Sequence, residues 1–343
     1  MIQGLVSTIV LNWNGKDVIG ACLESLTRQT YQPHEIIVVD NGSRDGSLEW
    51  VRDHFGPRVT LIENKENLGF AKGVNVGLRA ARGKFIALLN SDACADPKWI
   101  EHLVAGIQCS EKMGMCACKI LMMDRPGILD NTGELITRDG LGRGRGRLEK
   151  DEGQYDREKS VLCPSGCAAL YRRKMLDEIG LFDQHFFAYA DDIDVGLRGR
   201  LLGYECQYVP SAIVHHGFSR SFGHVSSLKA YYVERNRLWV VLKCFPMRYL
   251  LPSFFYSMVR YGYHLLGLFM RQGPAARYAE QFPALGLPLI VLKAYLSTLL
   301  FLPYLIRQRM LLRKKSRVSS KDFGLWLDCY GMGVREAALN ELA

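Results

Sequence analysis

The residues best suited to chemistry are aspartates, and the densest group of them lies beside aromatic side chains. Residues 186–200 read FFAYADDIDVGLRGR, so that Asp191, Asp192 and Asp194 closely follow two phenylalanines and a tyrosine. Removing a carboxylate from water beside aromatic groups is costly. Such walls raise the pKa of a carboxyl group toward the range of a general base. We therefore predict that one of these aspartates removes a proton from an acceptor hydroxyl.

The negative charge of these aspartates has a simpler explanation in part. If residues 191–202 form a helix, Asp194 and Arg198 are four positions apart and can pair with each other. Asp191 and Asp192 then lie in the first turn, where the helix dipole stabilises negative charge. Because the dipole does not explain the aromatic residues before them, Asp191 and Asp192 remain the strongest candidates.

Two further aspartates follow predicted strands. Asp40 ends EIIVVD and could accept hydrogen bonds from a nucleobase or ribose, or form a local Asx-turn. Asp92, within NSDA (90–93), suits a divalent cation that also binds a diphosphate, or could begin the next helix. Since each aspartate follows a separate strand, the two together favour one shared site.

His215 and His216 follow the predicted strand YVPSAIV. A histidine at a strand end, downstream of an acidic cluster, is a candidate metal ligand. A structural or exposed histidine explains the pair equally well, so both interpretations stay open.

The first hundred residues supply the elements that must position these groups. Short apolar runs alternate with stretches of helical periodicity, which predicts a parallel sheet with helices on both faces. Ligands of such sheets bind beyond the carboxyl ends of the strands. Asp40 and Asp92 should therefore lie at the same edge. The predicted strands are 5–12, 35–40, 59–64 and 84–90, and the predicted helices include 17–29 and 70–81.

The rest of the chain divides by composition. Residues 124–160 include GLGRGRGRLEKDEGQYDREKS, a glycine-rich and charged run that predicts a long exposed loop able to act as a lid. We predict a catalytic domain over 1–228 and a helical region over 229–343.

Two apolar stretches, 249–270 and 285–306, are about as long as a bilayer-spanning helix. Basic residues and prolines interrupt both, which favours helices that lie in the membrane interface or re-enter it. A spanning helix and an ordinary soluble helical subdomain are the alternatives. The interruptions are Pro252, Arg260, His264, Pro288, Lys293 and Pro303.

The charge and cysteine content narrow the function classes. The chain has a net charge of +9, and the run 307–321 contains seven basic residues and no acidic one. Such a patch suits anionic lipid headgroups or a polyphosphate. The ten cysteines form no paired CxxC set, which argues against a zinc site and favours reduced thiols in a cytoplasmic compartment. The N-terminus lacks the pattern of a signal peptide.

These motifs together resemble the family 2 glycosyltransferases of the GT-A fold, in the rhamnosyltransferase-like branch of bacterial polysaccharide assembly. The resemblance runs in order over roughly residues 5–245. The segments that carry it are TIVLNWNG, SLTRQTYQPHEIIVVDNGSRDGS, ENLGFAKGVNVGL, ALLNSDACADP, DEGQYD, PSGCAALYRR, IGLFDQHFFAYADDIDVGLRGRLLGY, VPSAIVHH and YYVERNRLW. The basic run RQRMLLRKKSRVS resembles the C-terminal part of such enzymes.

The resemblance implies a role for each matching residue. Asp192 would be the catalytic base, within Asp191-Asp192 where the family usually has Glu-Asp. Asp92 would be the retained carboxylate of the metal-binding motif, whose first acidic position is Asn90 in this chain. His215 or His216 would complete the metal site. The nucleotide sugar would be bound by Asn12, Asn14, Asp40, Asn67, Gly69, Lys72, Asn90, Ser91, Ser165, Gly166 and Arg198, of which Asp40 would contact the base and Arg198 the diphosphate.

The implied reaction is an inverting displacement at the anomeric carbon. The donor would be a nucleoside-diphosphate sugar, with dTDP-rhamnose suggested by the resemblance, and Mg²⁺ or Mn²⁺ would offset charge on the leaving group. The acceptor would be a glycan or a polyprenyl-diphosphate-linked sugar. The C-terminal region would hold the enzyme on the cytoplasmic face of the membrane as a peripheral or monotopic protein, on anionic lipids.

Three other functions compete with this one. A nucleotidyltransferase or another sugar-nucleotide enzyme would need a phosphate loop rich in glycine and lysine, whereas TIVLNWNGKD has one glycine. An inactive membrane-bound scaffold is favoured by Asn90 but not by the intact Asp40, Asp92 and Asp192. A nucleic-acid binder would need stacking aromatics among its basic residues, and the run 307–321 has none.

Overall fold

The computed structural model describes residues 1–217 and 226–340, and the chain divides into two compact units. Unit one comprises Met1–Glu134, Gly144–Arg200 and Tyr204–Ser221. Unit two comprises Leu135–Arg143, Leu201–Gly203 and Phe222–Ala343. The division into a catalytic domain over 1–228 and a helical region over 229–343 stays a prediction. Sequence reasoning did not identify the two short internal segments of unit two, because local composition does not report long-range packing.

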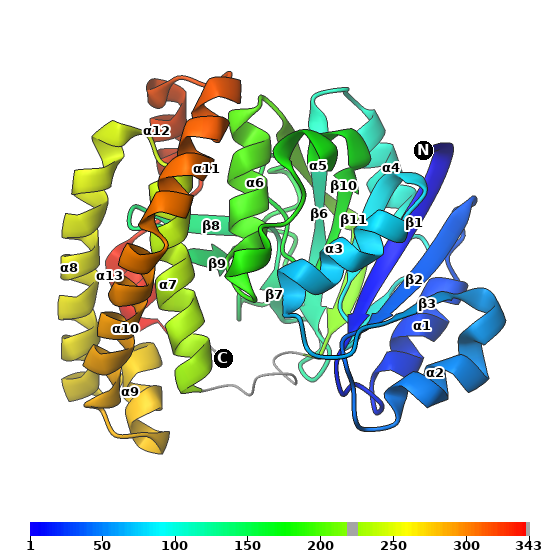
Figure 1. The fold of residues 1–343 in the computed structure, drawn as a ribbon, viewed down its shortest axis with the longest axis horizontal. Helices are drawn as coiled ribbons and strands as arrows, with labels where there is room; N and C mark the ends of the chain where they lie inside the picture. The colour runs from blue at the N-terminus through cyan, green and yellow to red at the C-terminus, as the bar shows by residue number, and fades with distance from the viewer. Residues whose placement is uncertain (218–225, 341–343) are drawn as a thin grey trace. The chain divides into compact units, whose positions relative to one another are not determined.

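Unit one is built on a nine-stranded sheet with the order β3-β2-β1-β4-β10-β6-β11-β5, and β7 pairs with β6 (Figure 1). The alternating part predicted from the sequence is parallel, whereas β10, β5 and β7 run antiparallel to their neighbours. The strands are β1 (Ile2–Asn12), β2 (His34–Asp40), β3 (Thr60–Glu63), β4 (Gly83–Leu89), β5 (Ala93–Ala95), β6 (Met113–Met122), β7 (Leu129–Asn131), β10 (Ala168–Arg172) and β11 (Glu205–His216).

The parallel register brings the strand ends together, as expected. Asn12 at the end of β1 lies opposite Asp40 at the end of β2, and Asp40 in turn lies opposite Glu63 of β3. Buried β-branched and apolar residues fill β1 and β2, which is typical of parallel strands that are covered on both faces. The polar residues that follow the strands therefore gather at one edge.

Helices cover both faces of this sheet, which confirms the α/β prediction. The helices α1 (Ile19–Thr27), α2 (Ser47–Phe55) and α4 (Trp99–Gln108) share one apolar cluster with alternate residues of the strands. On the other face, α3 (Phe70–Ala80) approaches β1 closely, because a Cβ at Gly77 would lie 2.6 Å from Ile9. The helices α5 (Arg173–Ile179) and α6 (Asp191–Leu201) complete the α-helices of unit one, and η2 (Gln184–Phe186) is a short 3₁₀ turn.

The segment 124–160 differs from the exposed loop that we expected. It contains β7, β8 (Glu134–Thr137) and β9 (Gly142–Gly144), and Leu129 and Asp130 within it are buried. Long-range contacts hold it down: Lys119 of β6 donates hydrogen bonds to Asp151 at 3.0 and 2.9 Å. The glycines of this segment lie in tight turns, which differs from the long exposed loop that we expected. Positive φ angles are found at Gly133, Gly140, Gly146 and Gly153.

Unit two is mainly helical. The apolar stretch 249–270 lies within a single helix, whereas the stretch 285–306 breaks at Phe301. Its elements are α7 (Ser227–Cys244), α8 (Met247–Met270), α9 (Gly273–Gln281), α10 (Gly286–Leu300), α11 (Leu302–Lys315), α12 (Ser320–Cys329), β12 (Gly331–Met332) and α13 (Val334–Leu339), and β12 pairs with β8.

Within residues 1–217 and 226–340, no individual helix has both the length and the apolar composition needed to cross a bilayer. The consecutive helices α9 and α10 meet that test only together, and a bend of 112° separates them.

A buried set of four charges joins the segments of unit two. Arg260 on α8 donates hydrogen bonds to Asp139 at 2.7 Å and to Glu234 of α7 at 2.9 Å. Arg237 forms ion pairs with the same two carboxylates. Burial raises the pKa of Glu234, but the charges of Arg237 and Arg260 outweigh burial and lower it. Two cations and two anions thus compensate one another in the interior.

We expect Glu234→Ala to lower the free energy of unfolding by about 3–5 kcal/mol, because the two arginines would stay buried without this partner. Urea-induced unfolding measures the loss. Glu280→Ala, an exposed position on α9, is the matched control and should change stability by less than about 0.5 kcal/mol. Equal effects of the two substitutions would contradict the role assigned to the ion set.

Candidate active site

The first group of site residues lies where β1 and β2 end. Asn12 donates through Nδ2 to Oδ1 of Asp40 at 3.0 Å and to Oγ of Ser47 at 2.9 Å. Oδ2 of Asp40 accepts the amide of Ser43 at 2.9 Å, so the local turn foreseen as the alternative for Asp40 is present. Asn14 joins this group through its amide, which donates to Oγ of Ser43 at 2.9 Å.

The group around Asn12 lies close to the predicted metal-binding motif at 90–92. A Cβ on Gly15 would lie 2.4 Å from Oδ1 of Asn12 and 3.5 Å from Oγ of Ser91, so little space separates these segments. In the described part of the chain, the buried Oδ1 of Asn12 has no hydrogen-bond partner. A buried acceptor of this kind is available to a donor group of a ligand.

The second group joins the end of β2 to the start of α3. Oδ1 of Asn67 accepts a hydrogen bond from Nδ2 of Asn41 and another from the amide of Gly69, each at 2.9 Å. Gly69 has φ 78° and directly precedes α3. Lys72 is exposed on the first turn of α3.

The third group surrounds the predicted base. Oδ2 of Asp192 accepts the amide of Gly166 at 3.0 Å, and Oδ1 accepts the amide of Ile193 at 2.8 Å. Oγ of Ser165 accepts the amide of Cys167 at 3.3 Å, which fixes the loop that presents Gly166. The structure therefore brings Ser165, Gly166 and Asp192 together.

The environment of the two aspartates has the predicted effect on their acidity. Burial raises the pKa of Asp191 well above its ordinary value, and the charge of Asp192 raises it further. Burial also raises the pKa of Asp192, although the amides of Gly166 and Ile193 lower it in part. Phe186, one of the aromatic residues that precede the two aspartates in the sequence, is fully buried.

The fourth group contains the predicted metal ligands. Nε2 of His216 lies 3.4 Å from Oδ1 of Asp92, and Nδ1 lies 2.7 Å from Oδ2 of Asp130. His215 points to the opposite face of β11, 3.6 Å from Asp96, because successive side chains of a strand alternate. The structure thus places His216, not His215, beside Asp92.

This donor set fits a hard cation only in part. Asp92 and His216 face each other, but Asp130 lies at the far nitrogen of the His216 ring and pairs with Arg147. Over residues 1–217 and 226–340, no three His, Cys, Asp or Glu side chains are grouped to hold a metal. Asn90 adds no carboxylate. A cation here would need further oxygen ligands from a bound molecule, and a diphosphate has that chemistry.

Arg198 lies in a buried ion pair. It donates to Oδ2 of Asp194 through Nε at 2.7 Å, and its Nη1 donates to the carbonyl of Ile179 at 2.8 Å. The simpler pairing on α6 is therefore present, and the diphosphate contact of Arg198 stays a prediction.

Sequence reasoning missed two buried acidic residues of this site, Asp130 and Glu134, and the partly buried Arg147. Burial raises the pKa of Glu134 to about 8, and the charge of Asp192 adds to the shift. Arg147 pairs with Asp130, whose pKa is lowered by the hydrogen bond with His216 and the charge of Arg147 even though burial raises it. A signal existed: ILDNTG (128–133) repeats the pattern of VVDNG (38–42), an apolar strand followed by Asp-Asn and a turn glycine.

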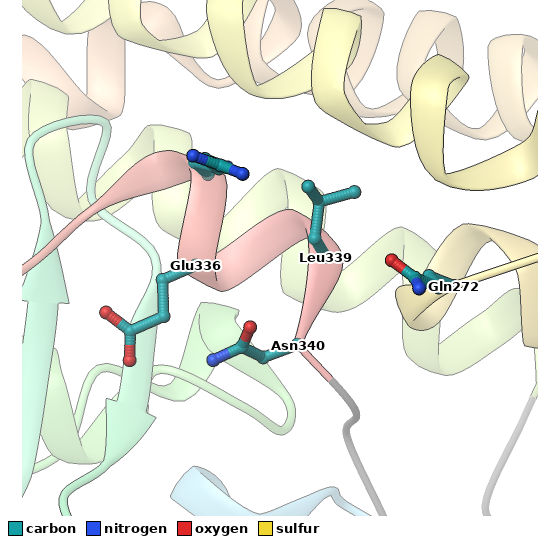
Figure 2. A pocket seen from close by; sticks show the side chains of 5 residues that line it. Gln272, Glu336, Leu339 and Asn340 are labelled. Atoms are coloured by element: carbon teal, nitrogen blue, oxygen red, sulfur yellow. The ribbon is translucent and has the colours of Figure 1, made fainter. Parts of the chain in front are cut away.

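A separate pocket lies in unit two and contains none of these residues. Figure 2 shows it, with a volume of about 330 Å³ and a lining of Gln272, Arg335, Glu336, Leu339 and Asn340. The groups suited to catalysis are instead those at the sheet edge of unit one.

Comparison with known proteins assigns this arrangement to a family. Residues 7–180 match the family described as Glycosyl transferase family 2. The match covers half of the chain and contains the ends of β1, β2 and β4. The chain belongs to this family.

Similar proteins include an uncharacterised glycosyltransferase of Haemophilus influenzae, 38% identical over 106 residues, which are 30% of this chain and 33% of the relative. The O-antigen biosynthesis protein RfbC of Myxococcus xanthus is 25% identical over 202 residues, 56% of this chain and 16% of that protein. The matches to these two relatives span a third or less of each relative's length.

Two solved structures share the fold. GalNAc-T7 with UDP, GalNAc and Mn²⁺ has a TM-score of 0.58 at 16% identity, over 71% of this chain and 48% of that one. The mannosyltransferase PcManGT of Pyrobaculum calidifontis with GDP-Man and Mn²⁺ has a TM-score of 0.50 at 16% identity, over 95% and 86%. At this identity the likeness concerns the fold.

Proposed function

We propose that this protein is an inverting glycosyltransferase that moves a sugar from a nucleoside diphosphate to a hydroxyl group of an acceptor. The observation that carries the proposal is the contact of Asp192, which follows the family 2 match over residues 7–180, with Gly166 inside that match. Its carboxylate is held by the amide of Gly166, next to the loop that continues into β10. Asp40 ends β2 and Asp92 follows β4, and these two strands flank β1 in the same sheet.

The chemistry needs one base. Asp192 takes the proton of the acceptor hydroxyl, the hydroxyl oxygen forms a bond to the anomeric carbon, and the bond from that carbon to the diphosphate breaks with its electron pair on the leaving group. A single displacement inverts the anomeric configuration and needs no second carboxylate as nucleophile. A divalent cation held by Asp92 and His216 would offset the charge of the leaving diphosphate.

The donor and acceptor are proposed by class. The solved neighbours contain UDP or GDP-Man, and the name of RfbC refers to O-antigen biosynthesis. A nucleoside-diphosphate hexose, with dTDP-rhamnose as the first candidate, is the proposed donor. A glycan or polyprenyl-diphosphate-linked sugar of a cell-surface polysaccharide is the proposed acceptor.

We further propose that unit two holds the protein on the cytoplasmic face of a membrane that contains anionic lipids. Residues 222–343 have 17 Lys and Arg against 6 Asp and Glu, an excess of 11, although the whole chain has only +9. Helix α8 also exposes large apolar residues at helical spacing, which would be costly in water. They include Met247, Leu251, Phe255, Met258, Leu265 and Phe269.

Asp192→Asn should lower kcat by roughly 10²–10⁴-fold, because an amide cannot accept the proton. Transfer from a panel of nucleotide sugars measures this, with Asp177→Asn on α5 as the control that keeps wild-type rates. Because the pKa of Asp192 is raised, kcat/KM should rise with pH along a limb above the ordinary pKa of aspartate, as the carboxylate forms. Full activity of Asp192→Asn would refute the assignment of the base.

His216→Ala should weaken Mn²⁺ binding by about 10–100-fold, since it removes the ring that faces Asp92. His215→Ala should leave the affinity within about twofold, because that ring points toward Asp96. Titration of Mn²⁺ by electron paramagnetic resonance, with UDP or dTDP present, measures both. A larger loss in His215→Ala would reverse the assignment.

The paired change Phe255→Glu and Phe269→Glu should reduce binding to phosphatidylglycerol vesicles at least about tenfold. These side chains are 59% and 88% exposed, and burying a phenylalanine in the interface contributes about 1.5–3 kcal/mol. Vesicle flotation measures the effect, and Met123→Glu, an exposed apolar residue of unit one, is the control. Unchanged flotation of the double variant would exclude α8 as the contact.

A further inference from the structure

The turn before the proposed base has an unusual backbone. Phe187, Tyr189 and Ala190 have φ values of 66°, 68° and 57°, and none of them is glycine. Residues other than glycine rarely adopt a positive φ, because their Cβ atom then lies too close to the backbone. The next residue, Asp191, begins α6. A backbone of this kind persists only where neighbouring structure holds it, and such sites concentrate near active sites.

The neighbouring structure is the N-terminus of α3. The carbonyl of Phe187 accepts the amide of Phe70 at 2.5 Å and the amide of Ala71 at 3.4 Å. These donors are among the groups that a helix leaves unpaired in its first turn. Phe187 therefore supplies from another segment the cap that α3 lacks in its own sequence.

Gly69 makes possible this contact between Phe187 and the start of α3, which we call the seat of Phe187. A Cβ at Gly69 would lie 2.5 Å from Cδ2, 2.6 Å from the carbonyl oxygen and 2.8 Å from Cγ of Phe187. The positive φ of Gly69 adds a second reason for glycine at this position. The ring and the carbonyl of Phe187 thus both pack against Gly69.

The seat connects the two ends of the proposed donor site. On one side, the amide of Gly69 donates to Asn67, which also accepts from Asn41, the residue after Asp40. On the other side, the turn leads to Asp192, whose carboxylate accepts the amide of Gly166. Phe70, which donates to Phe187, also extends its ring toward Gly166: a Cβ there would lie 3.6 Å from Cζ.

We propose that Phe187 is a positioning residue for Asp192: seated on Gly69 at the start of α3, it holds the strained turn 187–190 so that the carboxylate meets the amide of Gly166. This inference rests on the proposed function of Asp192. It predicts that the seat governs turnover more than donor affinity, because Phe187 acts on the base.

The first test is a double-mutant cycle of Gly69→Ala and Phe187→Ala, with kcat and donor KM measured separately. Gly69→Ala should lower kcat about 100-fold, the scale of a misplaced catalytic group, and should raise donor KM by a smaller factor, because Gly69 also belongs to the predicted donor-binding residues. Phe187→Ala removes two of the three atoms that the new methyl group would meet. The double variant should therefore be faster than Gly69→Ala. Strictly additive losses, or a loss confined to KM, would overturn the proposal.

The second test relaxes the turn without adding bulk. Ala190→Gly removes the cost of φ 57° and should leave the thermal midpoint no lower, yet it should reduce kcat about tenfold because the turn no longer holds one conformation. Arg271→Gly is the matched control: it is exposed in unit two, has φ 55°, and should keep the wild-type kcat. An Ala190→Gly variant with wild-type kcat would also overturn the proposal.

A measurement without substrate separates this inference from the proposed function. In Gly69→Ala, hydrogen exchange of the peptide that contains Gly166 should speed up at least about tenfold, because the acceptor of that amide has moved. Unchanged exchange refutes the positioning role. If the wild-type protein transfers no sugar from any donor, the proposed function fails, whereas the exchange result still decides whether Phe187 positions Asp192.

Discussion

The in-register parallel pairing of β1 with its neighbours is the constraint on which the site depends. Because Asn12 lies opposite Asp40, one amide nitrogen can bond to Asp40 and Ser47 together. A shift of one residue would turn Asn12 to the other face and separate these groups. The buried apolar residues of β1 and β2 fix that register. The polar edge is thus specified by the apolar core and not by the polar contacts themselves.

The acidic groups are held in two different ways. Asp130 and Asp194 form ion pairs with Arg147 and Arg198. Asp191 and Asp192 are offered mainly backbone amides, so burial dominates and their pKa values rise. A carboxyl group without a fixed counter-charge can change its protonation state during a reaction. This contrast separates the structural aspartates from those suited to proton transfer.

Much of the fold of unit one could be predicted because its signals are local. The pattern of apolar residues matches the observed secondary structure in the strands 5–12, 35–40 and 84–90 and in the helix 70–81. The family motifs lie at the ends of these elements. The pairing of β11 with β5 places His216 opposite Ala93, the residue after Asp92, and no local pattern contains that register. Asp130, Glu134 and Arg147 were missed for the same reason. Their segment is polar and glycine-rich in sequence, and only distant partners bury it. Arg198 shows the reverse case, since its helical spacing alone predicted the pair with Asp194 that the structure contains.

The buried charges of unit two bear on how such proteins can recombine. Asp139 belongs to a nine-residue segment of unit two, Leu135–Arg143, that interrupts the sequence of unit one, and its carboxylate pairs with Arg237 and Arg260 far along the chain. The helices after residue 226 are consequently not an independent tail. A hybrid made by joining this N-terminal portion to the C-terminal helices of a relative would keep Asp139 alone from the four charges of this ion set. Exchange of the helical portion between relatives therefore requires two linked segments to travel together, which should make such exchange rare.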